Sequence, residues 1–277
     1  MFNFQKIQYL LLMNWIDSHC HLKSFYEKGE LVNVLSNAAD VGLKKFINVG
    51  TSPTDWSIYR NLAELYNNMF YYTAGIHPLY VDQDWSASLD MLKSFWSLSK
   101  KPCALGEVGL DYFRLPKDAE SAIKIIQLQK ECLVNQLELA KELKCNVVIH
   151  SRNSFADCFS IIEEIGLDWK KVVFHCYSEG LEQLKKLKGR GAKASFTAMS
   201  FYEPRNNIRS ALKWYGLDEL MIETDSPYLP LKRGDRNANE PSSIPAIGKL
   251  VSELLEQPLD LVAKKTYSNT VEFFNLN

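Results

Sequence analysis

The sequence lacks several features that mark whole classes of protein. Its six cysteines form no C-x-x-C pair and lie mostly in apolar runs, so we expect buried thiols in a reducing compartment rather than a disulfide framework. No apolar run approaches the ~20 residues that a membrane-spanning helix needs. The N-terminal segment has no small-residue cleavage site of the kind that signal peptides carry. These absences favour a soluble, cytoplasmic protein that does not associate with membranes.

The chain also lacks an excess of charge of either sign, with 32 Lys and Arg against 33 Asp and Glu. A formal net charge of -1 provides no global positive field for duplex nucleic acid, so a polyanionic substrate must be held by local charges or by metal. No linker, low-complexity segment or repeat divides the chain, and we expect one domain over residues 1–277. Residues 1–12 are interpreted as an N-terminal extension, with Met13 as an alternative start.

Short apolar runs rich in β-branched and aromatic residues alternate with amphipathic stretches along the chain. This alternation predicts repeated β-α units and a parallel sheet, and about eight such runs match the number in a closed barrel. The expected fold is therefore a single-domain, TIM-like (β/α)8 barrel. The predicted strands are Trp15–His19, Lys45–Val49, Tyr71–Ile76, Cys103–Val108, Asn146–His150, Lys171–His175, Lys193–Thr197 and Glu219–Thr224.

Helices are predicted between these strands. The clearest runs from about Glu120 to Leu143, where apolar residues recur at helical spacing and indicate core packing. Shorter crossover helices are predicted at Leu31–Ala39, Trp56–Tyr66, Phe155–Ile165 and Leu181–Leu187, and the apolar segments Ile247–Leu255 and Leu259–Phe274 close the chain.

All five histidines fall at or just beyond the end of a predicted strand, and so do two carboxylates: His19, His21, His77, His150, His175, Glu107 and Asp225. In a parallel barrel these strand ends meet on one face, where active sites are built. A lone histidine on an apolar strand is more often a core residue than a ligand. Four strand-end histidines with two matching carboxylates reverse that expectation. His19 and His21, two apart on an extended chain, point to the same face, and Cys20 points away.

Six protein ligands are too many for one catalytic ion that keeps a position open for water, so we expect two divalent ions. Imidazole with carboxylate suits Zn, Mn, Fe or Ni, whereas Mg prefers oxygen and water, and the choice among Mg, Mn and Zn stays open. Paired ions that activate a bridging water suit phosphoester hydrolysis. Asp225 is interpreted either as the acceptor of the water proton or as a ligand only.

Six segments in this order resemble the TatD-like metal-dependent hydrolases, a family that includes deoxyribonucleases: DSHCHL at Asp17–Leu22, GIHP at Gly75–Pro78, GEVGLDY at Gly106–Tyr112, VIHSR at Val148–Arg152, VFHCYS at Val173–Ser178 and IETDSPY at Ile222–Tyr228. The resemblance implies a barrel hydrolase in which His19, His21, Glu107 and Asp225 surround one ion. It places Glu107, His150 and His175 around the other ion, so that Glu107 bridges the two.

The resemblance also implies substrate roles for Arg152 and for the stretch Arg233–Asn239. Three departures stand out in this chain. Leu79 occupies the position where many relatives have a second histidine after GIHP, Glu179 displaces the usual glycine to position 180, and the Arg233–Pro241 loop is longer than in some relatives.

Cations and aromatic residues that follow predicted strands are candidates for substrate contacts. Lys232, Arg233 and Arg236 are phosphate candidates, and His77 is interpreted as a substrate contact or as a partner of a metal ligand. The basic stretch Lys185–Lys193 precedes a strand and is interpreted as a solvated helix end. The aromatic residues at strand ends either stack on unpaired bases or pack loops: Tyr112, Phe113, Tyr177, Phe201, Tyr202 and Tyr228.

The preferred hypothesis is a metal-dependent nuclease that removes nucleotides from single-stranded DNA, from the 3′ end as the resemblance implies, with Glu107 and Asp225 as catalytic residues. A barrel mouth is a pocket and suits a chain end. We expect a monomer or a weak oligomer. The alternatives are hydrolysis of another ester or amide, as by an aminoacyl-tRNA deacylase or an amidohydrolase, and a noncatalytic binding protein that kept the barrel.

Overall fold

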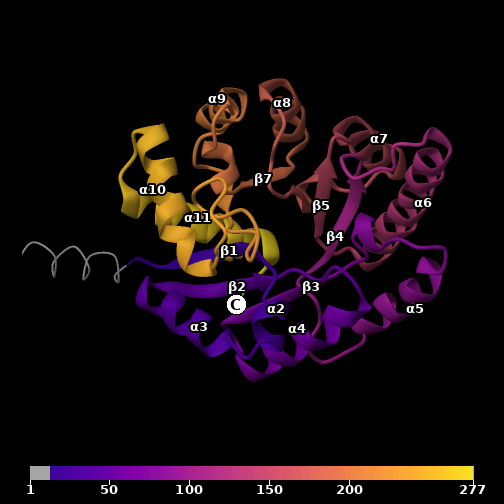
Figure 1. Ribbon diagram of the computed structural model, residues 1–277, viewed down its shortest axis with the longest axis horizontal. Helices are drawn as coiled ribbons and strands as arrows, with labels where there is room; N and C mark the ends of the chain where they lie inside the picture. The colour runs from indigo at the N-terminus through magenta and orange to yellow at the C-terminus, as the bar shows by residue number, and fades with distance from the viewer. Residues whose placement is uncertain (1–12, 277) are drawn as a thin grey trace, which may run out of the picture.

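Eight parallel strands neighbour one another in chain order in this computed structural model, which describes residues 13–276 (Figure 1). The strands are β1 (Trp15–Cys20), β2 (Leu43–Asn48), β3 (Phe70–Ala74), β4 (Ala104–Asp111), β5 (Val147–Arg152), β6 (Val172–Phe174), β7 (Lys193–Phe196) and β8 (Leu220–Ile222). Each adjacent pair from β1–β2 to β7–β8 is parallel. The predicted extension over residues 1–12 lies outside the described residues.

Hydrogen bonds between the ends of β8 and β1 close the ring. The backbone N–H of Asp225 donates to the His19 carbonyl at 2.9 Å, and the N–H of His21 donates to the Ser226 carbonyl at 2.7 Å. The Thr224 N–H adds a bond to Asp17 Oδ1 at 3.0 Å. The predicted TIM-like barrel is confirmed, and its seam lies beside the residues expected to bind metal.

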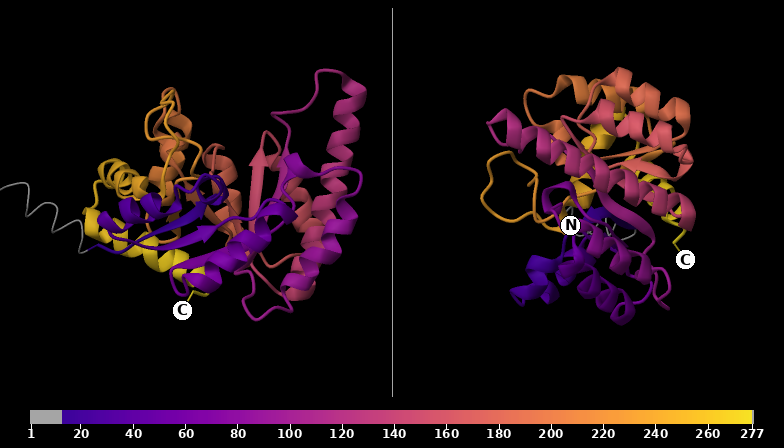
Figure 2. Two further views of the ribbon diagram at one scale, coloured as in Figure 1. Left: turned by 60° about the horizontal axis from the view of Figure 1, so that its bottom comes forward. Right: turned by 90° about the vertical axis from the view of Figure 1, so that its right-hand side faces the viewer.

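Helices surround the barrel, as Figures 1 and 2 show. They are α2 (Lys23–Glu27), α3 (Leu31–Asp40), α4 (Pro53–Leu65), α5 (Trp85–Phe95), α6 (Ala119–Leu143), α7 (Phe155–Ile165), α8 (Leu181–Arg190), α9 (Asn206–Tyr215), α10 (Ile244–Leu255) and α11 (Leu259–Phe274), with four short 3₁₀ turns η1 (Pro78–Tyr80), η2 (Trp169–Lys171), η3 (Ala198–Phe201) and η4 (Pro241–Ser243). Helices α2, α5 and α9 were not predicted. The helix predicted from Trp56 begins earlier, at Pro53, because Ser52 and Asp55 form a reciprocal cap.

The hydrophobic core has two parts. The larger part packs the outer side of the strands against the helices. The smaller part combines side chains from several strands, such as Ile47 on β2 and Val148 on β5, with Phe273 and Phe274 of α11. In Figure 2 the C-terminus lies on the opposite side of the molecule from the loop after β8. The aromatic pair packs at the N-terminal end of the strands, where the Phe273 carbonyl accepts a hydrogen bond from Asn146 just before β5, so the opposite face is left for polar side chains.

The strand bounds differ from the predicted ones, most clearly at β4, β6 and β8. β6 ends at Phe174 and β8 at Ile222, so His175 and Asp225 lie in the segments that follow. β4 continues to Asp111 because Gly109, at φ +151°, allows an unusually close approach to β5. A Cβ atom at Gly109 would lie 1.9 Å from the His150 carbonyl oxygen. A larger residue at this position would displace the strand that carries His150.

Within residues 13–276, no helix combines the length and the apolar character that crossing a bilayer requires. All six cysteines lie within these residues and are free thiols, as expected, and three of them are buried. Cys20 points away from its histidine neighbours, since its thiol donates to the Ile47 carbonyl at 3.5 Å.

Candidate metal centre

The fold brings all six expected ligands together at the C-terminal end of the barrel. Two of them extend from the end of β1, one lies within β4, one within β5, and one each directly after β6 and near the end of β8: His19, His21, Glu107, His150, His175 and Asp225. Residues more than 200 positions apart in the chain thus face one another across a few ångströms.

The first cluster consists of His19, His21 and Asp225. The two Nε2 atoms lie 3.1 Å apart, and Asp225 Oδ1 lies 3.5 Å from that of His19 and 3.3 Å from that of His21. Glu107 Oε2 lies 3.4 Å and 3.7 Å from the same two nitrogens. Ligand atoms at 2.0–2.2 Å from a tetrahedral metal are about 3.3–3.6 Å from each other. The first cluster and Glu107 Oε2 therefore have the spacing of a four-coordinate metal site.

The second cluster consists of His150 and His175. The other oxygen of Glu107, Oε1, lies 2.7 Å from His150 Nδ1 and 2.7 Å from His175 Nε2, and these two nitrogens are 3.3 Å apart. The contacts of Glu107 Oε1 with His150 and His175 are at hydrogen-bond distance, so a shared proton lies between Glu107 and each ring. A divalent cation would take the place of these protons when it binds.

Glu107 lies between the two clusters and directs one carboxylate oxygen to each. Its side chain is only 3% exposed. Burial raises the pKa of Glu107, but the surrounding imidazoles, His175 and His77 first, outweigh burial and hold the pKa well below its usual range. Glu107 is consequently an anion at neutral pH, which suits a carboxylate that bridges two cations.

In three rings, the hydrogen-bond partner of the outward-facing nitrogen determines which nitrogen carries the proton. His21 Nδ1 lies 2.9 Å from the Val49 carbonyl oxygen, which can only accept, so the proton sits on Nδ1 and the Nε2 lone pair faces the first cluster. His150 Nε2 lies 3.4 Å from Asp111 Oδ2, and His175 Nδ1 lies 3.4 Å from the carboxylate of Glu223. Each ring thus has an acceptor behind it.

His77 has the opposite arrangement. Its Nδ1 accepts the backbone N–H of Leu79 at 3.1 Å, while Nε2 points at Glu107 Oε1 and at His150 Nδ1, 3.4 Å and 3.3 Å away. Burial lowers the pKa of His77 to about 4, against the opposing charge of Glu107. The neutral ring therefore carries its proton on Nε2 and presents a donor, not a lone pair, to the centre.

Two acidic residues on the floor of the site had uncertain or unrecognised roles in the sequence. Asp17 accepts backbone N–H bonds from His19 and Thr224, so it fixes the chain at the barrel seam. Glu223 was not predicted: it is buried, accepts the Cys176 N–H at 2.7 Å and the Ser195 hydroxyl at 2.5 Å, and lies behind His175. The sequence signal that could have identified Glu223 is its position at the end of β8, two residues before Asp225.

The donor set fits two divalent ions. The structure contributes four imidazoles whose inward nitrogens converge and two carboxylates, one of which faces both clusters. Among residues 13–276, three overlapping groups of side chains have ligand atoms within 4.8 Å of one another: His19 with His175 and Glu223, His19 with His21 and Glu107, and His77 with Glu107 and His150. Imidazole and carboxylate ligands are those of Zn and Mn sites.

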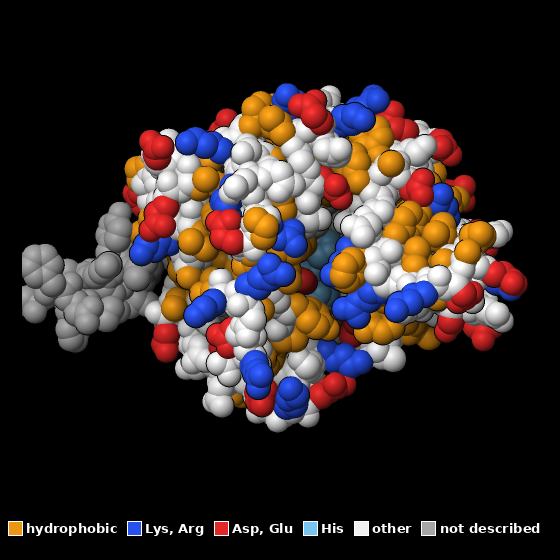
Figure 3. Space-filling model, turned by 45° about the horizontal axis from the view of Figure 1, so that its top comes forward, with side chains coloured by type: hydrophobic (Ala, Val, Ile, Leu, Met, Phe, Trp, Pro, Cys, Tyr) orange, Lys and Arg blue, Asp and Glu red, His pale blue; other side chains and the backbone are white. Residues whose placement is uncertain are grey.

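The expected substrate-binding residues lie at or after the ends of β3, β5 and β8. Arg152 ends β5, and its guanidinium stacks on the Phe113 ring at 3.9 Å. Arg233 and Arg236 are exposed in the loop after β8, and Arg233 donates to the Glu203 carbonyl at 3.0 Å. Figure 3 shows the histidines at the bottom of a hollow whose edge carries Lys and Arg side chains. Local positive charge therefore compensates for the near-zero net charge of the chain.

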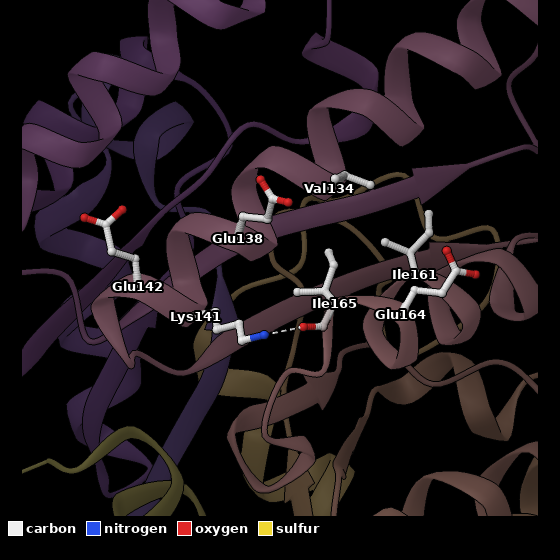
Figure 4. Close-up of a pocket in the computed structure, with 7 residues that line it drawn as sticks. All are labelled: Val134, Glu138, Lys141, Glu142, Ile161, Glu164 and Ile165. Atoms are coloured by element: carbon white, nitrogen blue, oxygen red, sulfur yellow. Dashed lines mark hydrogen bonds between the residues drawn. The ribbon is translucent and has the colours of Figure 1, made fainter.

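Two other surface features lie away from the strand ends. A groove of about 530 Å³ between α6 and α7 is lined by apolar side chains and three glutamates, and Lys141 donates there to the Ile165 carbonyl at 2.6 Å (Figure 4). It contains no histidine. The basic stretch from Lys185 is the end of α8 before β7, which agrees with its interpretation as a helix end.

Sequence comparison identifies the family. The family described as TatD related DNase matches residues 16–275, so the chain belongs to the TatD-related DNase family. It is 28% identical over 265 residues to a protein of Escherichia coli K12 named "Uncharacterized metal-dependent hydrolase YcfH", covering 95% of this chain and 96% of that protein. It is 27% identical to "Uncharacterized metal-dependent hydrolase YabD" of Bacillus subtilis, covering 94% and 99%.

Solved structures agree with this assignment. The structure of YjjV, a TatD homologue from Escherichia coli K12, superposes with a TM-score of 0.85 at 27% identity and covers 95% of this chain and 98% of that one. A TatD family hydrolase from Entamoeba histolytica has a TM-score of 0.80 at 22% identity, covering 96% and 99%, and supports the fold alone.

Proposed function

We propose that this member of the TatD-related DNase family is a divalent-metal-dependent hydrolase that cleaves phosphodiester bonds at the 3′ end of single-stranded DNA. The observation that carries the proposal is the position of Glu107, whose two oxygens face two separate sets of imidazoles. Two ions held in this way would lower the pKa of a bound water and stabilise both the attacking and the leaving oxygen of a phosphodiester.

The chain's own residues supply the proton transfers. Asp225 lies in the first cluster with 14% of its side chain exposed, so its carboxylate can both hold an ion and accept the proton of the attacking water. His77 presents an Nε2–H to the same centre and donates a hydrogen bond to the phosphate or to the leaving oxygen. His150 and His175 hold Glu107 in place from the other side.

Cations around the mouth favour a phosphate-bearing substrate. Arg152 is anchored against Phe113, and the exposed Arg233 and Arg236 follow β8. Guanidinium groups bind phosphate oxygens through paired hydrogen bonds, which position a strand without reading its sequence. The site lies in the mouth of a barrel, which favours a chain end over a long duplex.

The test is digestion of single-stranded DNA labelled at either end, with chelator and then with Mn, Mg or Zn restored. The wild type should shorten the strand from its 3′ end only with metal, and His150→Ala and Asp225→Asn should abolish this activity. Glu203→Gln, an exposed carboxylate outside both clusters, is the matched control and should keep it.

The same assay separates the alternatives. Aminoacyl-tRNA and small amides are offered in parallel with DNA, and hydrolysis of these alone would replace the nuclease by a deacylase or an amidohydrolase. Absence of hydrolysis, together with no thermal stabilisation by Mn or Zn, would favour a noncatalytic binding protein. Activity that persists in both ligand variants would refute the two-ion mechanism.

A further inference from the structure

Exposed aromatic side chains follow the ends of strands β3, β4 and β8. Tyr80 in η1 after β3 is 57% exposed, Phe113 after β4 is 60% exposed, and Tyr228 after β8 is 58% exposed. Large aromatic rings are normally among the more buried side chains, and exposed ones near a site often mark a binding surface. We call these three residues the aromatic rim.

Two members of the aromatic rim lie beside the candidate metal centre. The Tyr228 ring centroid is 5.9 Å from that of His21, and the Tyr80 centroid is 6.0 Å from that of His77. A group that stacks on either ring would therefore lie next to the hydrolytic centre.

Phe113 is held in position by an arginine side chain that stacks on its ring. The Arg152 guanidinium lies 3.9 Å from its ring centre and the ring is still largely exposed. The cation fixes the ring and leaves the rest of it in contact with solvent. Arg114, the next residue, is also exposed, so a second positive charge follows Phe113 in the chain.

Three other aromatic residues at the strand ends already form hydrogen bonds within the protein. Tyr112 donates to Asp157 at 2.7 Å, Tyr177 is 2% exposed and donates to the Gly180 carbonyl, and Tyr202 donates to the Pro230 carbonyl. These three pack and anchor loops. Of the stacking candidates in the sequence, Phe113 and Tyr228 keep a largely exposed ring, and the structure adds Tyr80.

From this juxtaposition of exposed rings and arginines around the centre, we propose that the aromatic rim binds the unpaired bases of the substrate strand by stacking. This inference rests on the proposed function and names the side chains by which the protein would select single-stranded over duplex DNA. Every base has a face that can stack on an aromatic ring, so such a surface binds single strands with little sequence preference. Bases in a duplex are already stacked, and so the rim favours unpaired ends.

The experiment measures binding without cleavage. Fluorescence anisotropy in chelator compares a fluorescein-labelled single-stranded oligonucleotide of mixed sequence with an abasic strand of equal length. Phe113→Ala, Tyr228→Ala and Tyr80→Ala should each weaken binding of the base-bearing strand by about 5-fold or more, the lower end of the cost per stacked base. Binding of the abasic strand should change less than 2-fold, about the error of such a comparison.

Two further variants make the result specific. Phe113→Leu keeps an apolar side chain without a ring and should behave like Phe113→Ala. Trp214→Ala removes an exposed aromatic ring on α9 that lies beneath Lys188, and should leave both affinities unchanged. Unchanged melting temperatures verify that the variants are folded.

Equal affinities of the wild type and of a variant with all three alanine substitutions for the base-bearing strand would overturn the proposal. Equal losses for the base-bearing and the abasic strand would also overturn it, because the rings would then not be contacting bases. Failure of the proposed function looks different: wild-type protein would then cleave no DNA when metal is restored, whatever the binding data in chelator show.

Discussion

Replacing Glu107 by glutamine is the sharpest perturbation of the centre. The change preserves the shape of the side chain and removes the negative charge that faces both clusters. Glu107 Oε1 is 2.7 Å from His150 Nδ1 and from His175 Nε2, and Oε2 is 3.4 Å from His19 Nε2. A neutral amide offers one oxygen to one cluster and an NH₂ group to the other, so it cannot bridge two cations.

The size of the effect follows from this geometry. Losing a partner that only orients a metal ligand costs about 10- to 100-fold in metal affinity or activity. Glu107 faces both metal positions directly, so Glu107→Gln should exceed the upper end of that range. We expect metal affinity and kcat/KM to fall by more than about 100-fold, which is about 2.7 kcal/mol. The pKa of His175, which Glu107 raises against the effect of burial, should fall as well.

Three readouts test this prediction. Metal content by mass spectrometry should fall from two ions per chain, calorimetry should give the weaker affinity, and histidine NMR should follow the pKa of His175. Glu203→Gln, an exposed exchange of the same kind, is the control. A Glu107→Gln protein that keeps two tightly bound ions and its activity would refute the bridging role.

Three more predictions follow from the same centre. Glu223→Gln removes the carboxylate behind His175 and should weaken metal binding by about 10- to 100-fold in calorimetry, and unchanged affinity would contradict this orienting role. His77→Phe should keep both ions yet lower kcat by about 100-fold or more, whereas loss of metal would identify His77 as a ligand. Burial lowers the pKa values of His150 and His175, but nearby carboxylates outweigh burial and raise them. Protons therefore compete with cations for these rings at low pH. The melting-temperature gain from Mn should therefore grow from about pH 6 to about pH 8, and a flat profile would contradict it.

The barrel and the convergence of the six side chains were predictable from the sequence. The histidines follow short apolar runs, and parallel strands that close into a ring must place these positions on one face. The HCH arrangement at the end of β1 directs His19 and His21 to the same side, and the structure places their Nε2 atoms 3.1 Å apart. The order of the strands along the chain and the two-residue alternation of side chains within a strand were sufficient to predict this convergence.

Other features depend on contacts that no local pattern encodes. The proton position on His77 is set by the backbone N–H of Leu79, and the role of Glu223 comes from its contacts with β7 and with the segment after β6. Helices α5 and α9 are a different case, because apolar residues recur along both at helical spacing, as Ile208, Ala211, Leu212 and Tyr215 do in α9, so this signal was available in the sequence and was missed. Which rim aromatics are exposed is a tertiary property.

Anomalous diffraction from crystals containing Mn tests the central claim most directly. The account predicts two peaks about 3.5–4 Å apart. One peak should lie among His19, His21 and Asp225 and the other between His150 and His175, with one oxygen of Glu107 bound to each. A single peak, or two peaks that do not share Glu107, would contradict it.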